Sequence, residues 1–145
     1  MFSTKPNDQV MKILIMGLPG SGKTTLANDL SKILDAGWIN ADKIREKFND
    51  WDFSKEGVLR QAERMGELAN NMKNKITIAD FVCPFEEGRR LFEPDYIIWM
   101  DTISKGRYST FDANFEKPKK YNFRISELNS KTNIEHIVKD IKNII

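Results

Sequence analysis

The sequence has very little cysteine. Cys83 is the single cysteine among 145 residues, so no internal disulfide can form, and an unpaired thiol points to a reducing compartment. No apolar run approaches the roughly 20 residues that cross a bilayer, and residues 1–8 offer no apolar core for a signal peptide. We therefore expect a protein that is neither exported nor embedded in a membrane, with the cytoplasm as its location.

The sequence also lacks an excess of charge of one sign. Its 23 basic and 21 acidic residues leave a net charge of +2, which gives no field that argues for nucleic acid as a partner. Glycine and proline are ordinary in number, and 40% of the residues are hydrophobic, as in a single globular domain. We expect one domain over residues 1–145, with any anion bound at a local site.

Short apolar runs alternate with longer amphipathic segments, which predicts an α/β fold. The expected strands are 12–16, 38–40, 76–82, 96–100 and, more weakly, 121–125. The runs KILIM and YIIWM are apolar almost throughout, which is typical of strands covered by helices on both faces.

Two longer segments have helical periodicity. Between Lys55 and Lys73 the apolar residues recur at steps of three and four, which predicts a helix with one face on the core. At the C-terminus Thr132 and Glu135 form a capping-box pattern before another apolar stripe. The polar stretch 104–120 has no sustained period, so we expect a loop or lid outside the core.

Residues 17–24, GLPGSGKT, fit the phosphate-binding pattern G-x-x-x-x-G-K-[ST] at every defined position. A predicted strand precedes the motif and a predicted helix follows it, so the backbone N–H groups and the helix N-terminus converge on phosphate oxygens. Lys23 is expected to reach the β- and γ-phosphates of ATP, and Thr24 to bind Mg²⁺. The predicted nucleotide-binding residues are Gly17, Gly20, Ser21, Gly22, Lys23, Thr24 and Thr25. The motif favours a three-layer α/β/α sandwich with a mainly parallel five-stranded sheet.

A carboxylate at a neighbouring strand end is expected to complete the magnesium site. Asp80 and Asp101 each end an apolar run, and only one of them needs to face the metal. A strand-end turn or a helix cap is the alternative for each. We favour Asp80.

The sequence identifies the phosphoryl acceptor less directly than it identifies the nucleotide. An N-K-x-D guanine motif is missing, which argues against a GTPase. Asp42 and Arg45 follow the second expected strand and, three residues apart at a helix start, share a face that can address one ligand. The alternative is a capping Asp beside a solvated Arg.

In ordered succession these motifs resemble the adenylylsulfate kinases, which phosphorylate the 3′-hydroxyl of adenosine 5′-phosphosulfate. Residues 40–45 (NADKIR) resemble the family's D-G-D-x-[VI]-R, and Phe53-Ser54 stands in place of its G-F-S. Residues 81–85 (FVCPF), followed by Arg89-Arg90, are similar to F-[IV]-S-P-F-R-x-x-R. Residues 96–102 resemble the strand ending in V-D-T, and 115–118 (FEKP) resemble Y-E-x-P.

The resemblance implies roles for individual residues. Asp42 would align or deprotonate the acceptor hydroxyl, Arg45 would hold the phosphosulfate, and Phe53 and Phe111 would sandwich the acceptor adenine. Core packing is the alternative for both phenylalanines. The resemblance also implies acceptor contacts from Gln61, Phe81 and Cys83, a catalytic cation at Arg107 in the lid, and a tendency to form a homodimer.

Departures from the family pattern leave other acceptors open. Val58 and Gln61 replace an arginine and an asparagine, with Arg60 or Arg64 as substitutes for the missing cation, and Cys83 replaces a serine. The lid is shortened to residues 103–110, with Lys105 and Arg107 as its cations. A kinase of another hydroxyl acceptor (a nucleoside, a nucleotide or a polynucleotide 5′-end) and a non-catalytic nucleotide-binding module are the alternatives.

Overall fold

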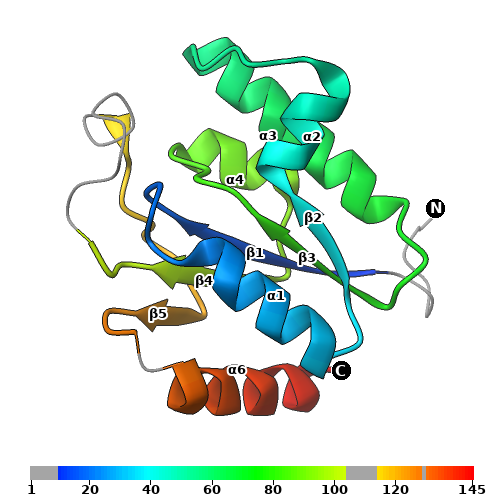
Figure 1. Ribbon diagram of the computed structural model, residues 1–145, viewed down its shortest axis with the longest axis vertical. Helices are drawn as coiled ribbons and strands as arrows, with labels where there is room; N and C mark the ends of the chain where they lie inside the picture. Colours follow the sequence, from blue (N-terminus) through cyan, green and yellow to red (C-terminus); the bar gives the residue numbers. More distant parts are fainter. Residues whose placement is uncertain (1–9, 104–113, 129) are drawn as a thin grey trace.

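The predicted alternation of strands and helices produces a parallel sheet between two layers of helices (Figure 1). The computed structural model describes residues 10–103, 114–128 and 130–145. In chain order the elements are β1 (Met11–Gly17), α1 (Lys23–Ile33), β2 (Gly37–Asn40), α2 (Ala41–Phe48), α3 (Lys55–Asn70), β3 (Ile76–Asp80), α4 (Glu86–Phe92), β4 (Tyr96–Met100), β5 (Phe123–Ile125) and α6 (Ser130–Ile144). The expected α/β sandwich is confirmed.

The order of the strands determines where a ligand can bind. The sheet runs β2-β3-β1-β4-β5, and every pairing in it is parallel. The chain leaves β1 toward β2 on one side, whereas it leaves β3 toward β4 on the other side. Open parallel sheets bind ligands at the carboxyl ends of the strands where this direction changes. That position lies between the ends of β1 and β3.

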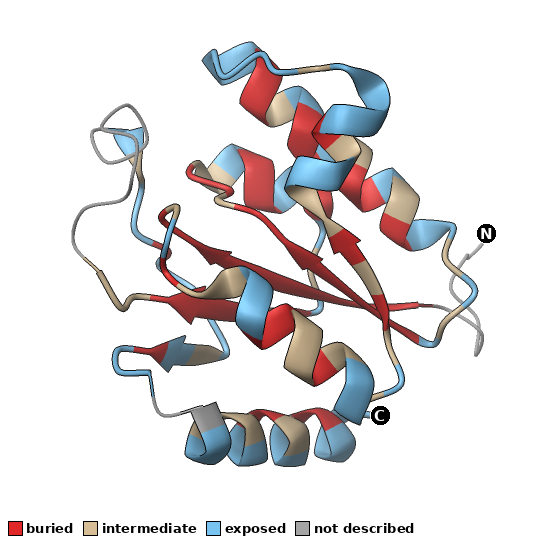
Figure 2. Ribbon diagram, in the orientation of Figure 1, coloured by how far each residue is buried: buried red, intermediate tan, exposed pale blue. Residues whose placement is uncertain are grey.

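β1 is buried along its length, with helices on both sides of the sheet (Figure 2), and its side chains alternate between the two faces. Ile13 and Ile15 pack with α1 and α6, while Leu14 and Met16 pack with α3 and α4. The helices contribute Leu26, Leu30, Ile137 and Ile141 to the first cluster and Ala62, Met65, Ala69 and Phe92 to the second. Both faces are therefore covered, which explains why residues 13–16 of β1 are apolar without a break.

Several predicted boundaries are wrong by a few residues. β3 ends at Asp80 and not at residue 82, because the chain leaves the sheet there and Cys83 takes a left-handed conformation with φ of 47°. β5 begins at Phe123, and α3 ends at Asn70. The last helix begins at Ser130, so Thr132 lies inside its first turn and is not its cap.

A buried lysine lies at the amino end of the sheet, opposite the carboxyl ends of the strands where a ligand can bind. The Lys12 side chain on β1 is almost fully buried, and its ammonium donates a hydrogen bond to the Phe92 carbonyl at the end of α4. It also lies 5.1 Å from the centre of the Phe92 ring. The Lys12 backbone N–H donates to the Asp95 carboxylate at 2.8 Å. These contacts attach α4 to the amino end of the sheet.

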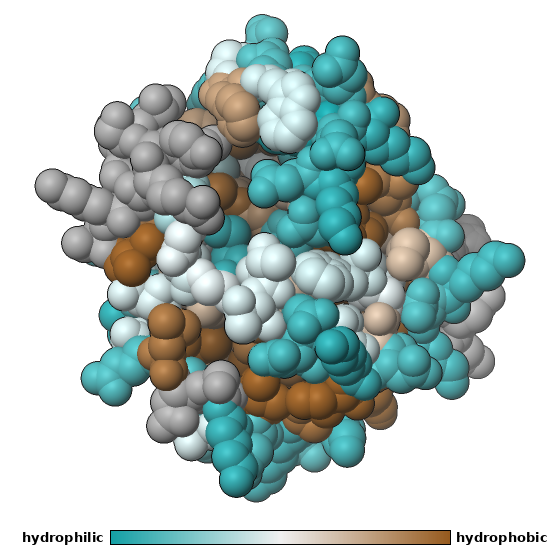
Figure 3. All heavy atoms as spheres, viewed as in Figure 1, coloured by the Kyte–Doolittle hydropathy of each residue, from teal (hydrophilic) through white to brown (hydrophobic). Residues whose placement is uncertain are grey.

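Apolar surface gathers away from the strand ends. Between α1 and α6 lies a groove of about 580 Å³, lined by Ile33, Ile134 and Val138 with polar side chains at its rim, and Figure 3 shows the brown area over these helices. None of the groove's lining residues belongs to the 17–24 loop. No helix within the described ranges has both the length and the apolar composition that crossing a bilayer requires.

Candidate active site

The phosphate-binding motif forms a tight loop between β1 and α1. Gly17, Gly20 and Gly22 have φ of 153°, 90° and 102°, a backbone region that side chains rarely adopt. A Cβ on Gly17 would approach the Met100 carbonyl oxygen on β4 to 2.6 Å. Glycine is thus required both for the curl of the loop and for its closeness to the sheet.

The N-terminus of α1 differs from those of the two helices that follow. Its N-cap, Gly22, has no side chain to bond the first turn, and that turn holds no acidic residue. In contrast, Asn40 and Ser54 cap α2 and α3 with side-chain oxygens. The first N–H groups of a helix need acceptors, and the positive end of its dipole favours an anion. This end therefore suits nucleotide phosphates, with Thr25 exposed in the same turn.

Two further side chains shape the loop. The Lys23 ammonium donates to the Leu18 carbonyl at 3.0 Å, so the lysine curls back over its own loop. The Ser21 hydroxyl is buried and has no partner among the described residues, while the Thr102 hydroxyl donates to the Ser21 carbonyl at 2.8 Å. The end of β4 is thereby fastened to the loop.

Thr24 and Asp80 come together although 56 residues separate them in the sequence. The Thr24 hydroxyl donates to the Asp80 carboxylate at 2.9 Å, and the Trp38 indole N–H donates to the other Asp80 oxygen at 2.9 Å. The Asn40 amide lies 3.2 and 3.3 Å from the two Asp80 oxygens. Burial, with 3% of the residue exposed, raises the pKa of Asp80, and the hydrogen bonds and the Lys23 charge oppose that shift.

This arrangement fits a magnesium ion that arrives with a nucleotide. Because Thr24 gives its proton to Asp80, its lone pairs point away from that carboxylate and remain for a cation. Within the described residues no three His, Cys, Asp or Glu side chains group closely enough to hold a metal. Phosphate oxygens would supply the remaining ligands. Asp101 is instead paired with Arg124 at 2.6 Å, so the geometry favours Asp80.

On the acceptor side, Asp42 and Arg45 both lie on α2, but their environments differ. Asp42 is exposed in the first turn. Arg45 is 5% exposed, and its guanidinium donates to the carbonyls of Asp50 at 2.8 Å and Asp52 at 3.3 Å. The same guanidinium lies 4.4 Å from the centre of the Phe53 ring. Desolvation lowers the pKa of Arg45, with Asp50 opposing the shift.

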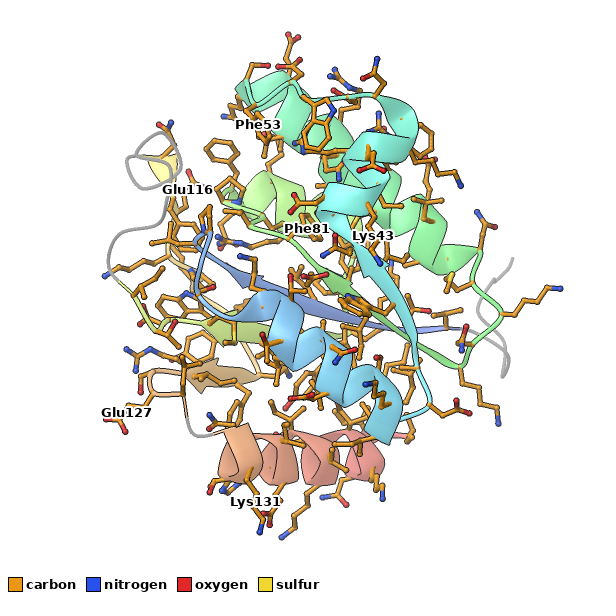
Figure 4. All side chains as sticks on the ribbon, viewed as in Figure 1. Lys43, Phe53, Phe81, Glu116, Glu127 and Lys131 are labelled. Atoms are coloured by element: carbon orange, nitrogen blue, oxygen red, sulfur yellow. The ribbon has the colours of Figure 1, made fainter. Side chains whose placement is uncertain are left out.

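Phe53 lies on the surface, not in the core. It is 45% exposed and stands before α3, at the upper end of the molecule in Figure 4. Gly57 makes room for this segment, because a Cβ there would approach the Asp52 carbonyl oxygen to 2.1 Å. An exposed aromatic ring held by a buried arginine is available to stack on a base.

The other expected acceptor residues are buried. Phe81 packs edge-on against Phe92 at 5.6 Å, and Cys83 is 2% exposed. The Gln61 amide donates to the Ala41 carbonyl at 3.1 Å and accepts from Arg64 at 3.0 Å, so it braces the start of α2. Arg107 and Phe111 lie outside the described residues.

Asp50 pairs with Arg60 and Arg64, the two arginines expected to substitute for the cation that Val58 replaces. Arg60 and Arg64 each approach the Asp50 carboxylate to 2.9 Å, and Arg60 also pairs with Asp52 at 3.1 Å. Val58 itself is buried. Both guanidiniums therefore tie α3 to the 50–52 segment.

The sequence motifs contain Asn40 and Arg89 but predict no role for either, and they do not include Trp38. Trp38 and Asn40 fall in the expected strand 38–40, and both bond to Asp80. An Asn at a strand end two residues before Asp42 is a signal that points to the second of them. Arg89 is buried, and it donates to the Cys83 carbonyl at 3.1 Å, to Glu86 and to the Glu116 carbonyl. Arg89 thus fastens the segment after the lid to α4.

Three features define a nucleotide-binding protein of the P-loop class. They are the order of the strands in the sheet, the glycine loop followed by a helix without a side-chain cap, and the Thr24–Asp80 pair. A sequence profile of the adenylylsulphate kinase family matches residues 9–94. The chain belongs to this family of P-loop kinases, as its motifs predict.

Individual relatives agree with this assignment in part. The chain is 35% identical over 83 residues to the bifunctional enzyme NodQ of Rhizobium meliloti and 32% identical over 98 residues to an adenylyl-sulfate kinase of Bacillus pumilus. These matches cover 52% and 62% of the chain, but only 13% and 50% of the respective relatives. A third relative is the nucleoside-triphosphatase THEP1 of Thermotoga maritima, 31% identical over 123 residues, with 75% of the chain and 70% of THEP1 covered.

Among solved structures, the APS kinase CysC of Mycobacterium tuberculosis in complex with AMPPNP and APS shares the fold. It superposes with a TM-score of 0.79 at 19% identity, covering 92% of this chain and 98% of that one.

Proposed function

We propose that the chain is an ATP-dependent kinase that transfers the γ-phosphate to the 3′-hydroxyl of adenosine 5′-phosphosulfate, as in sulfate activation. The observation that carries the proposal is a juxtaposition. Asp42 stands two residues after Asn40, and the Asn40 amide contacts Asp80 and lies 3.5 Å from the Thr24 hydroxyl. An acceptor-aligning carboxylate and the phosphate loop therefore share one end of the sheet. Family membership and the CysC fold support the same reaction.

On the nucleotide side, the loop N–H groups and Lys23 bind the phosphates of ATP. Thr24, supported by Asp80, would hold Mg²⁺, which neutralises the charge that develops on the β- and γ-phosphates. Ser21, Gly22 and Thr25 belong to the same phosphate-binding loop and helix start. Catalysis then consists of positioning and electrostatic stabilisation.

On the acceptor side, the 3′-hydroxyl oxygen forms the new bond to the γ-phosphorus while the bond to the ADP oxygen breaks. Asp42 aligns the hydroxyl and accepts its proton, which then passes to solvent. Phe53 stacks on the acceptor base, and the Arg45 guanidinium supports its ring. Arg107 and Phe111 contribute from the lid. We expect this reaction in the cytoplasm and expect a homodimer.

A panel of acceptors with γ-labelled ATP tests the proposal. Label on adenosine phosphosulfate, identified as the 3′-phosphate by mass spectrometry, supports it. Label on another hydroxyl compound assigns a different acceptor. Phosphate release without any acceptor favours a nucleoside triphosphatase, the second candidate, which the THEP1 match over 75% of the chain supports. Lys23→Ala is the inactive control, since it removes the cation at the transferring phosphoryl group.

The arginine of the family pattern that Val58 replaces allows a second test of the acceptor's identity. Because Val58 is buried, the fold of Val58→Arg is first checked by circular dichroism. If adenosine phosphosulfate is the acceptor, the folded variant has a KM for it that is lower by about 10- to 150-fold, the equivalent of roughly 1.5 to 3 kcal/mol for one charged contact. Val58→Leu is the matched control for size and leaves the KM unchanged. No transfer to saturating adenosine phosphosulfate by a protein that binds ATP refutes the proposal.

A further inference from the structure

Asn40 touches both halves of the candidate site. It ends β2 and caps α2, with φ of −97° and ψ of 129°. Its side-chain oxygen accepts from the Lys43 backbone N–H at 3.1 Å. Its amide nitrogen lies 3.2 Å from the nearer Asp80 oxygen and 3.5 Å from the Thr24 hydroxyl. One amide thus joins the start of the acceptor helix to the magnesium pair.

The chemistry of these partners fixes the orientation of the amide. A backbone N–H only donates and an ionised carboxylate only accepts, so the oxygen must face Lys43 and the nitrogen must face Asp80. Capping alone does not require asparagine, because aspartate and serine cap helices about equally well. Aspartate would place a second carboxylate against Asp80, and serine is too short to replace the amide nitrogen. Only the donor side of the contact requires an amide at this position.

The start of α2 has other contacts besides Asn40: Ala41 and Ile44 pack against the core cluster, and the Lys43 ammonium lies 5.8 Å from the centre of the Trp38 ring. The Gln61 amide supports the Ala41 carbonyl from α3. Asp42 itself is exposed, so no packing of its own side chain fixes its position. The Asn40 hydrogen bonds connect this helix turn directly to Thr24 and Asp80.

We propose that Asn40 is a positioning residue that couples occupancy of the phosphate loop to the order of α2, and so to the position of Asp42. The proposal rests on the proposed function only in that Thr24 and Asp80 hold a magnesium nucleotide. A nucleotide that immobilises this pair also immobilises the Asn40 amide, and the cap of α2 becomes harder to open. The acceptor-aligning carboxylate is then fixed only after the nucleotide is in place.

Amide hydrogen exchange of the full chain, with Mg-ADP as the probe, tests the coupling without any acceptor. In the wild type, saturating Mg-ADP should slow exchange at Lys43, Ile44 and Arg45 by about 5- to 150-fold, the usual range for coupled sites. In Asn40→Ser, which keeps the cap, the slowing should fall below about twofold. Asn71→Ser is the matched control: its amide donates to the Glu67 carbonyl at 2.9 Å at the far end of α3, and it should behave as wild type.

Two measurements keep the outcomes distinct. Mg-ADP binding is measured on each variant, so loss of nucleotide affinity is separated from loss of coupling, and Asn40→Asp provides a second capped variant if the serine variant unfolds. The coupling is overturned if saturating Mg-ADP slows amide exchange in Asn40→Ser as much as in the wild type. It is also overturned if Mg-ADP does not slow exchange in the wild type. Failure of Mg-ADP to bind the wild type overturns the proposed function. With any acceptor that is phosphorylated, Asn40→Ser should lower kcat at least tenfold while the KM for ATP stays within twofold.

Discussion

At the scale of single residues, two side chains of α2 that were expected to act together have separate roles. Asp42 is exposed and faces no carbonyl or cation at bonding distance in the described contacts, whereas Arg45 is buried and bonded to the chain itself. An acceptor can therefore reach the Asp42 carboxylate, whereas the Arg45 guanidinium is occupied by the 50–53 segment.

Asp42→Asn should lower kcat by about 100-fold or more and leave the KM for ATP unchanged, since an aligning or basic carboxylate contributes this much. The loss of a negative charge from the first turn of α2 costs only about 0.3 to 1 kcal/mol, so the variant folds. Steady-state kinetics check the prediction, with Glu46→Gln on the same helix as control. A loss confined to the KM for ATP would make Asp42 a nucleotide contact.

Arg45→Lys should raise the KM for the acceptor about tenfold and spare ATP, because lysine cannot bond both carbonyls and support the Phe53 ring. Loss of these bonds should also lower the free energy of unfolding by about 1 to 3 kcal/mol. A double variant with Phe53→Leu separates direct from indirect action. If Arg45 works through Phe53, the double variant is no worse in acceptor KM than Phe53→Leu alone; additive losses would place Arg45 on the acceptor.

At the scale of elements, Asp50 is the joint between α2 and α3. Hydrogen bonds from Arg60 and Arg64 hold the pKa of Asp50 well below its usual range. A lowered folded-state pKa stabilises the protein above the unfolded value near 3.9, and that contribution is lost as pH falls through the acid range.

The urea midpoint of Asp50→Asn should therefore lie below that of the wild type at pH 7, and the difference should shrink as pH falls from about 4 toward 2. Asp29→Asn on α1 is the control for removing one carboxylate. A difference between wild type and Asp50→Asn that does not vary with pH would mean that Asp50 contributes through its shape alone.

Local patterns account for the parts of the structure that the sequence predicts. Residues 12–16 and the glycine loop were predicted because hydrophobic periodicity and phosphate-loop chemistry are encoded over a few neighbouring residues. The Thr24–Asp80 bond was expected only in outline, and the Asn40 and Trp38 bonds to Asp80 were not expected at all. These contacts join residues about 40 to 56 positions apart, and no local pattern specifies them. The burial of Arg45 was missed for the same reason, because the carbonyls that it binds belong to an irregular segment.

At the scale of the whole molecule, the two ends of the sheet have different tasks. The carboxyl ends of β1, β2 and β3 carry Gly17, Asn40 and Asp80, while the amino end is closed by Lys12 on the Phe92 carbonyl. Substitutions at the amino end should therefore change stability and leave catalysis intact.

Lys12→Ala should lower the free energy of unfolding by about 1 to 3 kcal/mol, because it removes the buried ammonium donor and its contact with the Phe92 ring. At roughly 3 °C per kcal/mol for a chain of this size, the Tm falls by about 3 to 9 °C. Differential scanning calorimetry measures this change, with Lys75→Ala, exposed before β3, as control. Kinetic constants that change in a folded variant would show that the two ends of the sheet are not independent.

The buried thiol of Cys83 is a natural probe for opening of the layer formed by α3 and α4. Desolvation raises the pKa of this thiol to about 12, so very little reactive thiolate exists at neutral pH while the chain is folded. Once the layer of α3 and α4 lifts from the sheet, the thiol regains an ordinary pKa near 8.5 and reacts. Because the chain has one cysteine, the rate at which an alkylating reagent consumes thiol reports the population of the open state where reclosing outpaces alkylation, and the opening rate where alkylation is faster, with no engineered label.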